Sequence, residues 1–264
     1  LTADQIQAID TSMMPNLTTV AVKALKAANL VNFSPDQIAA LSDTALATLV
    51  AAQTVSVDIS ALSSAQMGVL TSSAIAGLPT IQISSMSEAQ LAALTTANIK
   101  GLTTAQVKAI SSDQIAALES DDVSALSAAQ VGFLNIEGFT ADQIKALNAL
   151  NIKGLTAAQM KLLTAEQVEA MESADVRLLS SAQIAAIDGA NFAPTFLAAL
   201  TSAGVKSLLP AQIAKLNGDN IPMLAPAALK GLTSAQVKAL TSDQVPAFSS
   251  AQIAALAQIG RAHV

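Results

Sequence analysis

Charged side chains are the groups in this chain most able to bind a partner, and they recur at fixed spacing. Acidic residues occupy one recurring position: Asp36, Asp113, Asp142, Glu166, Asp219 and Asp243. Basic residues occupy another: Lys23, Lys100, Lys153, Arg177, Lys206 and Lys230. A row of carboxylates could bind a hard cation such as Ca²⁺. An acidic row on one molecule could also pair with a basic row on another.

Residues that usually carry catalysis are scarce. The 264 residues contain no Cys and one His, which excludes thiolate metal sites, disulfides and Cys nucleophiles and leaves little room for His chemistry. No phosphate-binding Gly loop, G-x-S-x-G or H-E-x-x-H pattern is present. Asp121 and Asp122 are adjacent and would point in different directions on a helix. We therefore expect no catalytic residue, no cofactor and no bound metal, and a protein that is not an enzyme.

The charge spacing follows from an eight-residue repeat that covers the chain. Residues 102–109, LTTAQVKA, show the unit: Leu, Ser/Thr, two small or acidic residues, Gln, Ile/Val, any residue and Ala. Ser/Thr at position two is a preferred N-cap, and Gln at position five completes a capping box. Positions one and six fall on one face, so each unit predicts a very short helix that needs neighbours to bury it.

A second period lies on top of the first, because position five departs from Gln in every third unit. The departures are 24 or 29 residues apart, which equals three units or three units plus five residues. We place the extra residues within longer corner units at 49–61, 126–138 and 179–191. The departures at this period are Ala21, Ala45, Ala74, Asn98, Asp122, Asn151, Asp175, Gly204 and Ala228, and Met13, Asn29, Phe196 and Asn220 depart from Gln outside it.

These periods predict an all-α fold, an α-solenoid with about three short helices in each 24-residue coil. The alternative is a two-helix coil of 16 residues. Residues 1–264 would form a single continuous repeat array. Phe33, Phe139 and Phe192, which stand at position one, should fill the core.

In a three-helix coil, the two charged rows would become one acidic and one basic edge. Lateral assembly through those edges is one interpretation. A second is that the charges serve the helix dipole, because the acids fall in the first turn and the bases in the last. Calcium bridging is a third, although carboxylates one coil apart would be ~9–10 Å from each other.

The longer corner units are a further candidate binding region, since solenoids often bind through such loops. The polar residues there are Asp58, Asn135, Glu137, Asp188 and Asn191. The other interpretation is structural: the extra residues relieve twist or remain from a duplicated block.

Composition limits the partners. The net charge is −6 and no Lys/Arg cluster exists, so we expect no nucleic acid. No run of about 18 apolar residues could span a bilayer. The chain begins at Leu1 inside a repeat, which suggests a processed product or a part of a longer protein. Both ends look like interior units, and exposed Leu1, Ile6, Ile253 and Leu256 would favour stacking end to end into filaments.

Units such as LTTAQVKA, LTSAQVKA, LTSDQVPA and FSSAQIAA resemble the LTxxQI-type short-helix repeat arrays of large bacterial surface and adhesin-like exoproteins. They are more distantly similar to the superhelical repeats of mesothelin and stereocilin. The first resemblance implies an extracellular or cell-surface building element, such as an adhesin spacer or a fibre subunit. Its partners would be further copies of itself or neighbouring segments of a larger protein. The alternative hypothesis is a protein-binding solenoid scaffold that uses its corner loops or charged rows.

Overall fold

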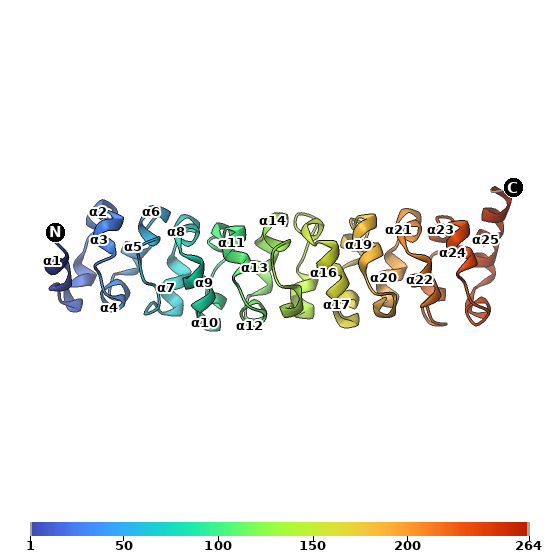
Figure 1. Cartoon of the computed structure of the whole chain (residues 1–264), viewed down its shortest axis with the longest axis horizontal. Coiled ribbons are helices and arrows are strands. Elements are labelled where there is room, and N and C mark those ends of the chain that lie inside the picture. Colours follow the sequence, from blue (N-terminus) through green and yellow to red (C-terminus); the bar gives the residue numbers. More distant parts are fainter. Residues whose placement is uncertain (1, 263–264) are drawn as a thin grey trace. The chain divides into compact units, whose positions relative to one another are not determined.

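The computed structural model describes residues 2–262, which form short α-helices and 3-10 helices and contain no β-strand. The chain divides into two compact units, residues 1–138 and residues 139–264. Each unit is a helical solenoid in which successive helices run around a common axis (Figure 1). The first helix is α1 (Ala3–Gln7).

Most eight-residue repeats fold as predicted, into a helix of about one turn, and those with Ser/Thr at position two and Gln at position five close it with a capping box. In the unit that contains α12 (Ser112–Ala116), the Ser111 hydroxyl accepts from the Gln114 backbone N–H at 3.2 Å. The Gln114 Oε1 accepts from the Ser111 N–H at 2.9 Å. Between helices the chain turns through two extended residues, as at Leu70 (φ −62°, ψ 142°) and Thr71 (φ −76°, ψ 160°). No described residue has a positive φ, so these corners do not require glycine.

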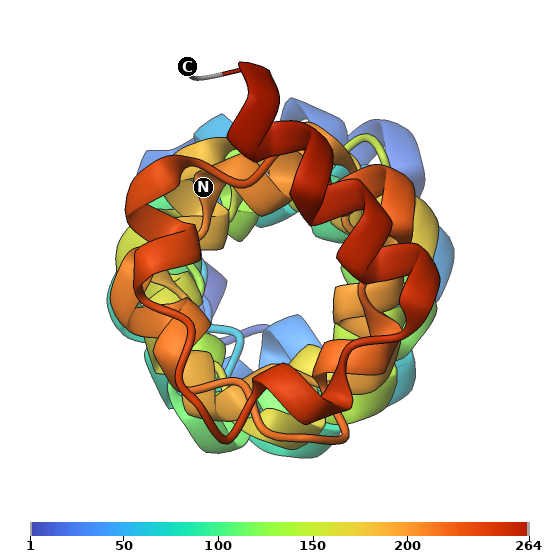
Figure 2. The same cartoon turned by 90° about the vertical axis from the view of Figure 1, so that its right-hand side faces the viewer.

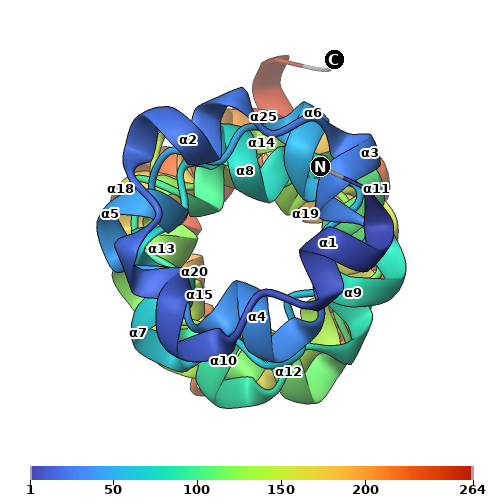
Figure 3. The same cartoon turned by 90° about the vertical axis from the view of Figure 1, so that its left-hand side faces the viewer.

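In the N-terminal unit each helix packs on a helix of the next coil, and these contacts define three rows, here called columns, that wind around the axis, as α2, α5, α7 and α10 do in Figure 3. The first column contains α2 (Thr19–Ala24), α5 (Asp43–Leu46), α7 (Ser64–Val69), α10 (Glu88–Ala92), α12 and η3 (Ile136–Gly138). The second contains α3 (Ala27–Leu30), α6 (Ala51–Thr54), α8 (Ser72–Gly77), η2 (Ile99–Gly101) and α13 (Ser120–Ala125). The third contains η1 (Thr11–Asn16), α4 (Pro35–Ala39), α9 (Thr80–Ser85), α11 (Thr104–Lys108) and α14 (Ala128–Val131).

The C-terminal unit has the same organisation (Figure 2). One column contains α15 (Ala141–Lys145), α17 (Ala165–Glu169), η5 (Gly189–Asn191), α22 (Pro210–Ala214) and α24 (Ser234–Lys238). A second contains α16 (Ala157–Leu162), α19 (Ser181–Ala186), α21 (Ser202–Ser207), α23 (Pro226–Leu229) and α25 (Ser250–Ala262). The third contains α18 (Ser173–Val176), α20 (Pro194–Ala199) and η6 (Ile221–Met223). Along the chain, η4 (Ile152–Gly154) stands three repeats before α18 and η7 (Val245–Ala247) three repeats after η6.

The stacking confirms a solenoid with three helices in each coil. Helix pairs such as α11 and α9, or α22 and α24, are three repeats apart and pack on each other. The two-helix alternative is wrong, because it would bring together units two repeats apart.

The prediction that five extra residues lengthen one unit at 49–61, 126–138 and 179–191 is also wrong. In the N-terminal unit, α5 packs on α7 and α6 packs on α8, so residues 57–61 occupy one side of a coil. Gln82 of α9 holds this segment, since its Nε2 donates to the Val57 carbonyl at 2.7 Å and its Oε1 accepts from the Ile59 N–H at 3.2 Å. The five-residue segments ending in η3 and η5 likewise pack on α12 and α17. Five residues with a single tight turn are therefore long enough to form one side of a coil. We call the three segments of this kind, 57–61, 134–138 and 187–191, the short units.

The core consists of the apolar residues at positions one and six, as the repeat predicts; in α12 and its corner these are Ile110 and Ile115. The three Phe residues at position one, Phe33, Phe139 and Phe192, are buried, which confirms them as core residues. The ring of Phe192 stacks on that of Phe196 with centroids 5.4 Å apart. Phe196 is also fully buried and stands at position five in place of Gln.

Candidate functional site

The buried Gln side chains at position five form the main polar network of both units. Each side-chain oxygen closes the capping box of its own helix, and each side-chain nitrogen crosses to the preceding coil. In Gln114, Nε2 donates to the carbonyl of Ile83 at 3.2 Å and to that of Met86 at 2.8 Å. The same paired contacts are made by Gln37, Gln53, Gln106, Gln130, Gln183, Gln236, Gln244 and Gln252.

Sequence reasoning predicted the capping box and missed the contact between coils. The sequence does contain a sign of this contact between coils. A capping box accepts Glu as well as Gln, yet Glu never stands at position five. Only the amide of Gln supplies a donor for the neighbouring carbonyls.

Two buried Asp residues interrupt this network. Asp122 and Asp175 stand at position five and are 3% and 6% exposed. Burial raises the pKa of Asp122 to about 6, and the negative charges of Glu119 and Asp121 add to the effect. Burial also raises the pKa of Asp175, with a further contribution from Glu172. The sequence marked both as departures from Gln, and it considered Asp122 with Asp121 as a carboxylate pair and set that pair aside.

The structure divides the predicted basic edge among columns, so a single basic edge is wrong. Lys23 lies on α2 and Lys100 on η2, which belong to different columns of the N-terminal unit. In the C-terminal unit, Arg177 follows α18 and Lys206 lies on α21, again in different columns. The remaining two are Lys153 on η4 and Lys230, which follows α23 in the column of Lys206.

The predicted acidic edge is divided in the same way. Asp36 lies on α4 and Asp113 on α12, in different columns. Asp142 on α15 and Glu166 on α17 share a column. Asp219 and Asp243 lie in the turns before η6 and η7. The physical reason is that each short unit forms a whole side of a coil, which moves every following repeat to the next column.

The placement of the charges fits the helix-dipole interpretation. Asp36, Asp113, Asp142 and Glu166 lie in first helical turns, where the exposed backbone N–H groups favour negative charge. The Lys residues on α2, η2, η4 and α21 lie in last turns, where the carbonyl ends favour positive charge.

The polar residues of the short units mainly shape those units. Asp58, Asn135 and Asp188 each accept through a side-chain oxygen from the backbone N–H two residues later, at 2.9, 3.2 and 3.0 Å. Asn135 also donates to the Ser112 hydroxyl at 2.7 Å, and Asn191 donates to the Leu163 carbonyl at 2.8 Å. These bonds cap the tight turn and fasten it to the preceding coil.

Glu137 is exposed on η3. Together these positions account for all five polar residues that the sequence marked at the corners.

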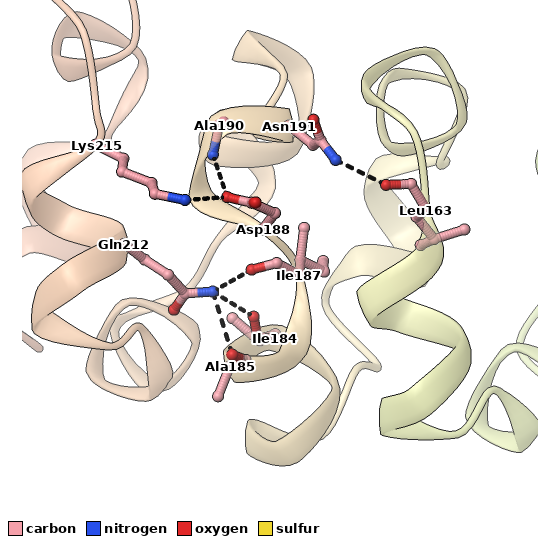
Figure 4. A network of polar contacts seen from close by, with 9 residues as sticks. All are labelled: Leu163, Ile184, Ala185, Ile187, Asp188, Ala190, Asn191, Gln212 and Lys215. Carbon is pink, nitrogen blue, oxygen red and sulfur yellow. Dashed lines mark hydrogen bonds and ion pairs between the residues drawn. The ribbon is translucent and has the colours of Figure 1, made fainter.

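A groove with a volume of about 240 Å³ opens beside the short unit 187–191. Its lining includes the apolar side chains of Ile187 and Leu209 together with Lys161, Asp188 and Lys215. Lys215 Nζ pairs with Asp188 Oδ1 at 2.5 Å (Figure 4). The Ala190 N–H, and then Lys215, lower the pKa of the Asp188 carboxyl. In this groove the structure joins a predicted corner residue, Asp188, to a cavity lined by basic side chains.

The residues predicted to join molecules end to end have different surroundings. Ile6 is fully buried, so the expectation that it is exposed is wrong; its side chain fills the core at position six. Ile253 on α25 is 45% exposed and Leu256 is half-buried. Leu1 lies outside the described residues.

Within residues 2–262, no three His, Asp or Glu side chains come together in a way that could hold a metal ion. None of the helices in this range combines the length and apolarity that crossing a membrane requires.

Comparison with known proteins identifies the repeat. The family model of the ALTTAQ repeat matches residues 83–120 and 221–258. Both matches begin at position six of a unit and cover consecutive repeats of the kind described above. No curated protein matches the chain. The chain is thus a helical repeat protein, two stretches of which are similar to the ALTTAQ repeat.

Proposed function

We propose that this protein is a structural, non-enzymatic building element, a spacer or fibre subunit of an extracellular bacterial surface protein. The observation that carries the proposal is the recurring Gln contact. Each contact ties the corner of one coil to the helix of the next, and it recurs through both units. The resemblance to repeat arrays of bacterial surface and adhesin-like proteins supports the extracellular location.

The proposal includes self-assembly, in which copies associate through the C-terminal helix α25. Its support is the 45% exposure of Ile253, a large apolar side chain on that helix. Such a contact would join unlike surfaces of two copies and would therefore continue as a filament.

Electron microscopy and sedimentation over a hundredfold range of protein concentration test the assembly. We expect filaments with a fixed axial repeat at high concentration, and their loss in Ile253→Asp. The matched control is Ala251→Asp, which places the same charge at a small exposed position on α25. Single particles at every concentration, or filaments unaffected by Ile253→Asp, would count against assembly through this helix.

A second candidate function is a protein-binding scaffold, and the groove beside residues 187–191 is the observation that favours it. Lys161 and Lys215 would select a partner segment that carries carboxylates, while Leu209 offers an apolar contact. Titration with a fluorescent Glu-rich peptide distinguishes the two functions. Binding that is lost in Lys161→Glu and kept in Lys238→Glu, an exposed position on α24, would favour the scaffold.

A further inference from the structure

The repeats at 118–125, LESDDVSA, and 171–178, MESADVRL, share two departures from the consensus: Glu at position two and Asp at position five. One of these repeats lies in each compact unit. Position five is where Gln donates to the preceding coil elsewhere in the chain. The chain has thus placed a buried carboxyl group twice at a position where Gln donates to the preceding coil in other repeats.

A side chain as short as Asp can reach the preceding coil from this position. Asn98, which has the same length, donates through Nδ2 to the carbonyls of Met67 at 3.2 Å and Gly68 at 3.3 Å. Those residues are 31 and 30 positions earlier in the sequence. The same offsets from Asp122 lead to Leu91 and Ala92, and from Asp175 to Ile144 and Lys145.

In the preceding coil, the turns opposite the two Asp residues also lack the Gln amide donor that binds the carbonyl of the equivalent turn elsewhere. Gln114 donates to the carbonyl 28 residues earlier, that of Met86. The corresponding carbonyls belong to Leu94 for Asp122 and to Leu147 for Asp175. Across the part of the chain that the structure describes, neither carbonyl oxygen receives a hydrogen bond. A carboxylate has no hydrogen to donate, whereas a carboxylic acid has one.

We propose that Asp122 and Asp175 are acid-responsive contacts between coils: when protonated, each carboxyl group donates its O–H to a carbonyl of the preceding corner, at 91–94 or 144–147. The solenoid is then tighter in mild acid than at neutral pH. At neutral pH each Asp is a carboxylate and lies against carbonyl oxygens of the preceding coil. The coil that carries the Asp and the preceding coil are then held together less firmly. This property goes beyond a structural role and would let acidity set how firmly coils adhere.

Acidic neighbours of each group favour its protonation, while Arg177, in the same repeat as Asp175, carries the opposite charge. Beside Asp122, Glu119 and Asp121 raise its pKa in addition to burial, and beside Asp175 Glu172 does the same. Helix α20, which packs on α18, carries no titratable side chain. Other charged residues lie on elements that pack on these two repeats or that form the turns opposite them. They are Lys100 on η2, Glu88 on α10, Asp142 and Lys145 on α15, and Lys153 on η4.

The direction of the pH effect follows from the raised pKa. An exposed Asp has a pKa of about 4, while that of folded Asp122 is about 6. Between these values the folded protein binds a proton that the unfolded chain does not. The stability that this proton contributes is complete below about pH 4 and is lost as the pH rises through about 6. Asp175 acts in the same direction.

Hydrogen exchange on the full chain between pH 5 and pH 7, corrected for the intrinsic exchange rate, tests the proposal. In the natural protein we expect the protection of amides in 118–126 to fall at least about fivefold from pH 5 to pH 7. In Asp122→Asn, which restores an amide donor, protection should be high and nearly independent of pH. Asp175→Asn should have the same effect on 171–179. The control Asp113→Asn, at an exposed position on α12, should leave both pH dependences unchanged.

A direct titration keeps the proposal falsifiable if a variant fails to fold. The side-chain carboxyl carbon resonance of Asp122 in the natural protein should titrate with a midpoint above pH 5. A midpoint near 4 would overturn the proposal. So would an Asp122→Asn variant whose protection varies with pH as steeply as that of the natural protein.

Discussion

At the scale of the residue, one Gln side chain performs two tasks in each repeat. Its oxygen completes a local capping box and its nitrogen binds two carbonyls of the preceding coil, as Gln114 shows. The two tasks use opposite ends of the amide, so Glu can replace only the first. At the same position a carboxyl group is buried in Asp122, and burial, with the charges of Glu119 and Asp121, raises its pKa to about 6.

Gln114→Glu should therefore destabilise its coil although it preserves the capping box. The carbonyls of Ile83 and Met86 would lose their donor and face a buried charge, for which we expect a loss of about 3 kcal/mol at neutral pH. Hydrogen exchange of amides in 83–86 and 111–118 measures the effect. Gln7→Glu, at an exposed position on α1, is the control and should change little. Equal effects of the two variants would show that the Nε2 contact contributes nothing.

At the scale of the element, the spacing of the coils leaves no room for a side chain at certain helix ends. A Cβ on Gly101, at the end of η2, would overlap the backbone of Ser72 in the helix beneath it. Gly231, after α23, is in the same position over Ser202. These glycines are needed for close approach and not for a left-handed backbone, since no described residue has a positive φ.

Gly101→Ala should push η2 away from α8 and cost about 2 kcal/mol, because the backbone of Ser72 cannot turn aside as a flexible side chain would. Gly218→Ala is the matched control, as its new Cβ would meet nothing within 4 Å. It should be neutral or stabilising by about 0.5 kcal/mol through a less flexible unfolded chain. Thermal unfolding of both variants provides the comparison. A neutral Gly101→Ala variant would contradict the close packing of η2 on α8.

At the scale of the whole molecule, contacts within each unit join a coil to its neighbours, as in other repeat proteins. Stability in such a chain is approximately a sum of coil and interface contributions. The division into two compact units, 1–138 and 139–264, adds a boundary at which cooperativity can end.

Ile115→Asp should consequently loosen a local group of coils. Ile115 is fully buried on α12, so the change places an unpaired charge in the core of the N-terminal unit. Hydrogen exchange should show lost protection in α10, α12 and η3, which pack together, and retained protection in α19 to α24. Ala116→Asp, at the next and exposed position, is the control. Uniform loss of protection along the chain would show that the solenoid unfolds as a single unit.

The sequence by itself determined the local structure: a capped helix of about one turn in each repeat, with positions one and six in the core. Those features depend on neighbouring residues, such as Ser111 and Gln114, and can be read from their spacing. The sequence also determined that each helix packs on the helix three repeats later, because Gln at position five is replaced in every third repeat.

Only the tertiary structure decided which column each repeat occupies. A side of a coil can be eight residues or five, and contacts between coils such as that of Gln82 with Val57 select the shorter length at the short units. Each short unit moves the following repeats to the next column, which separates Lys23 from Lys100 and Asp36 from Asp113. The partners of the Gln amides were undecided for the same reason, since they lie 25 to 31 residues away and no local pattern specifies them.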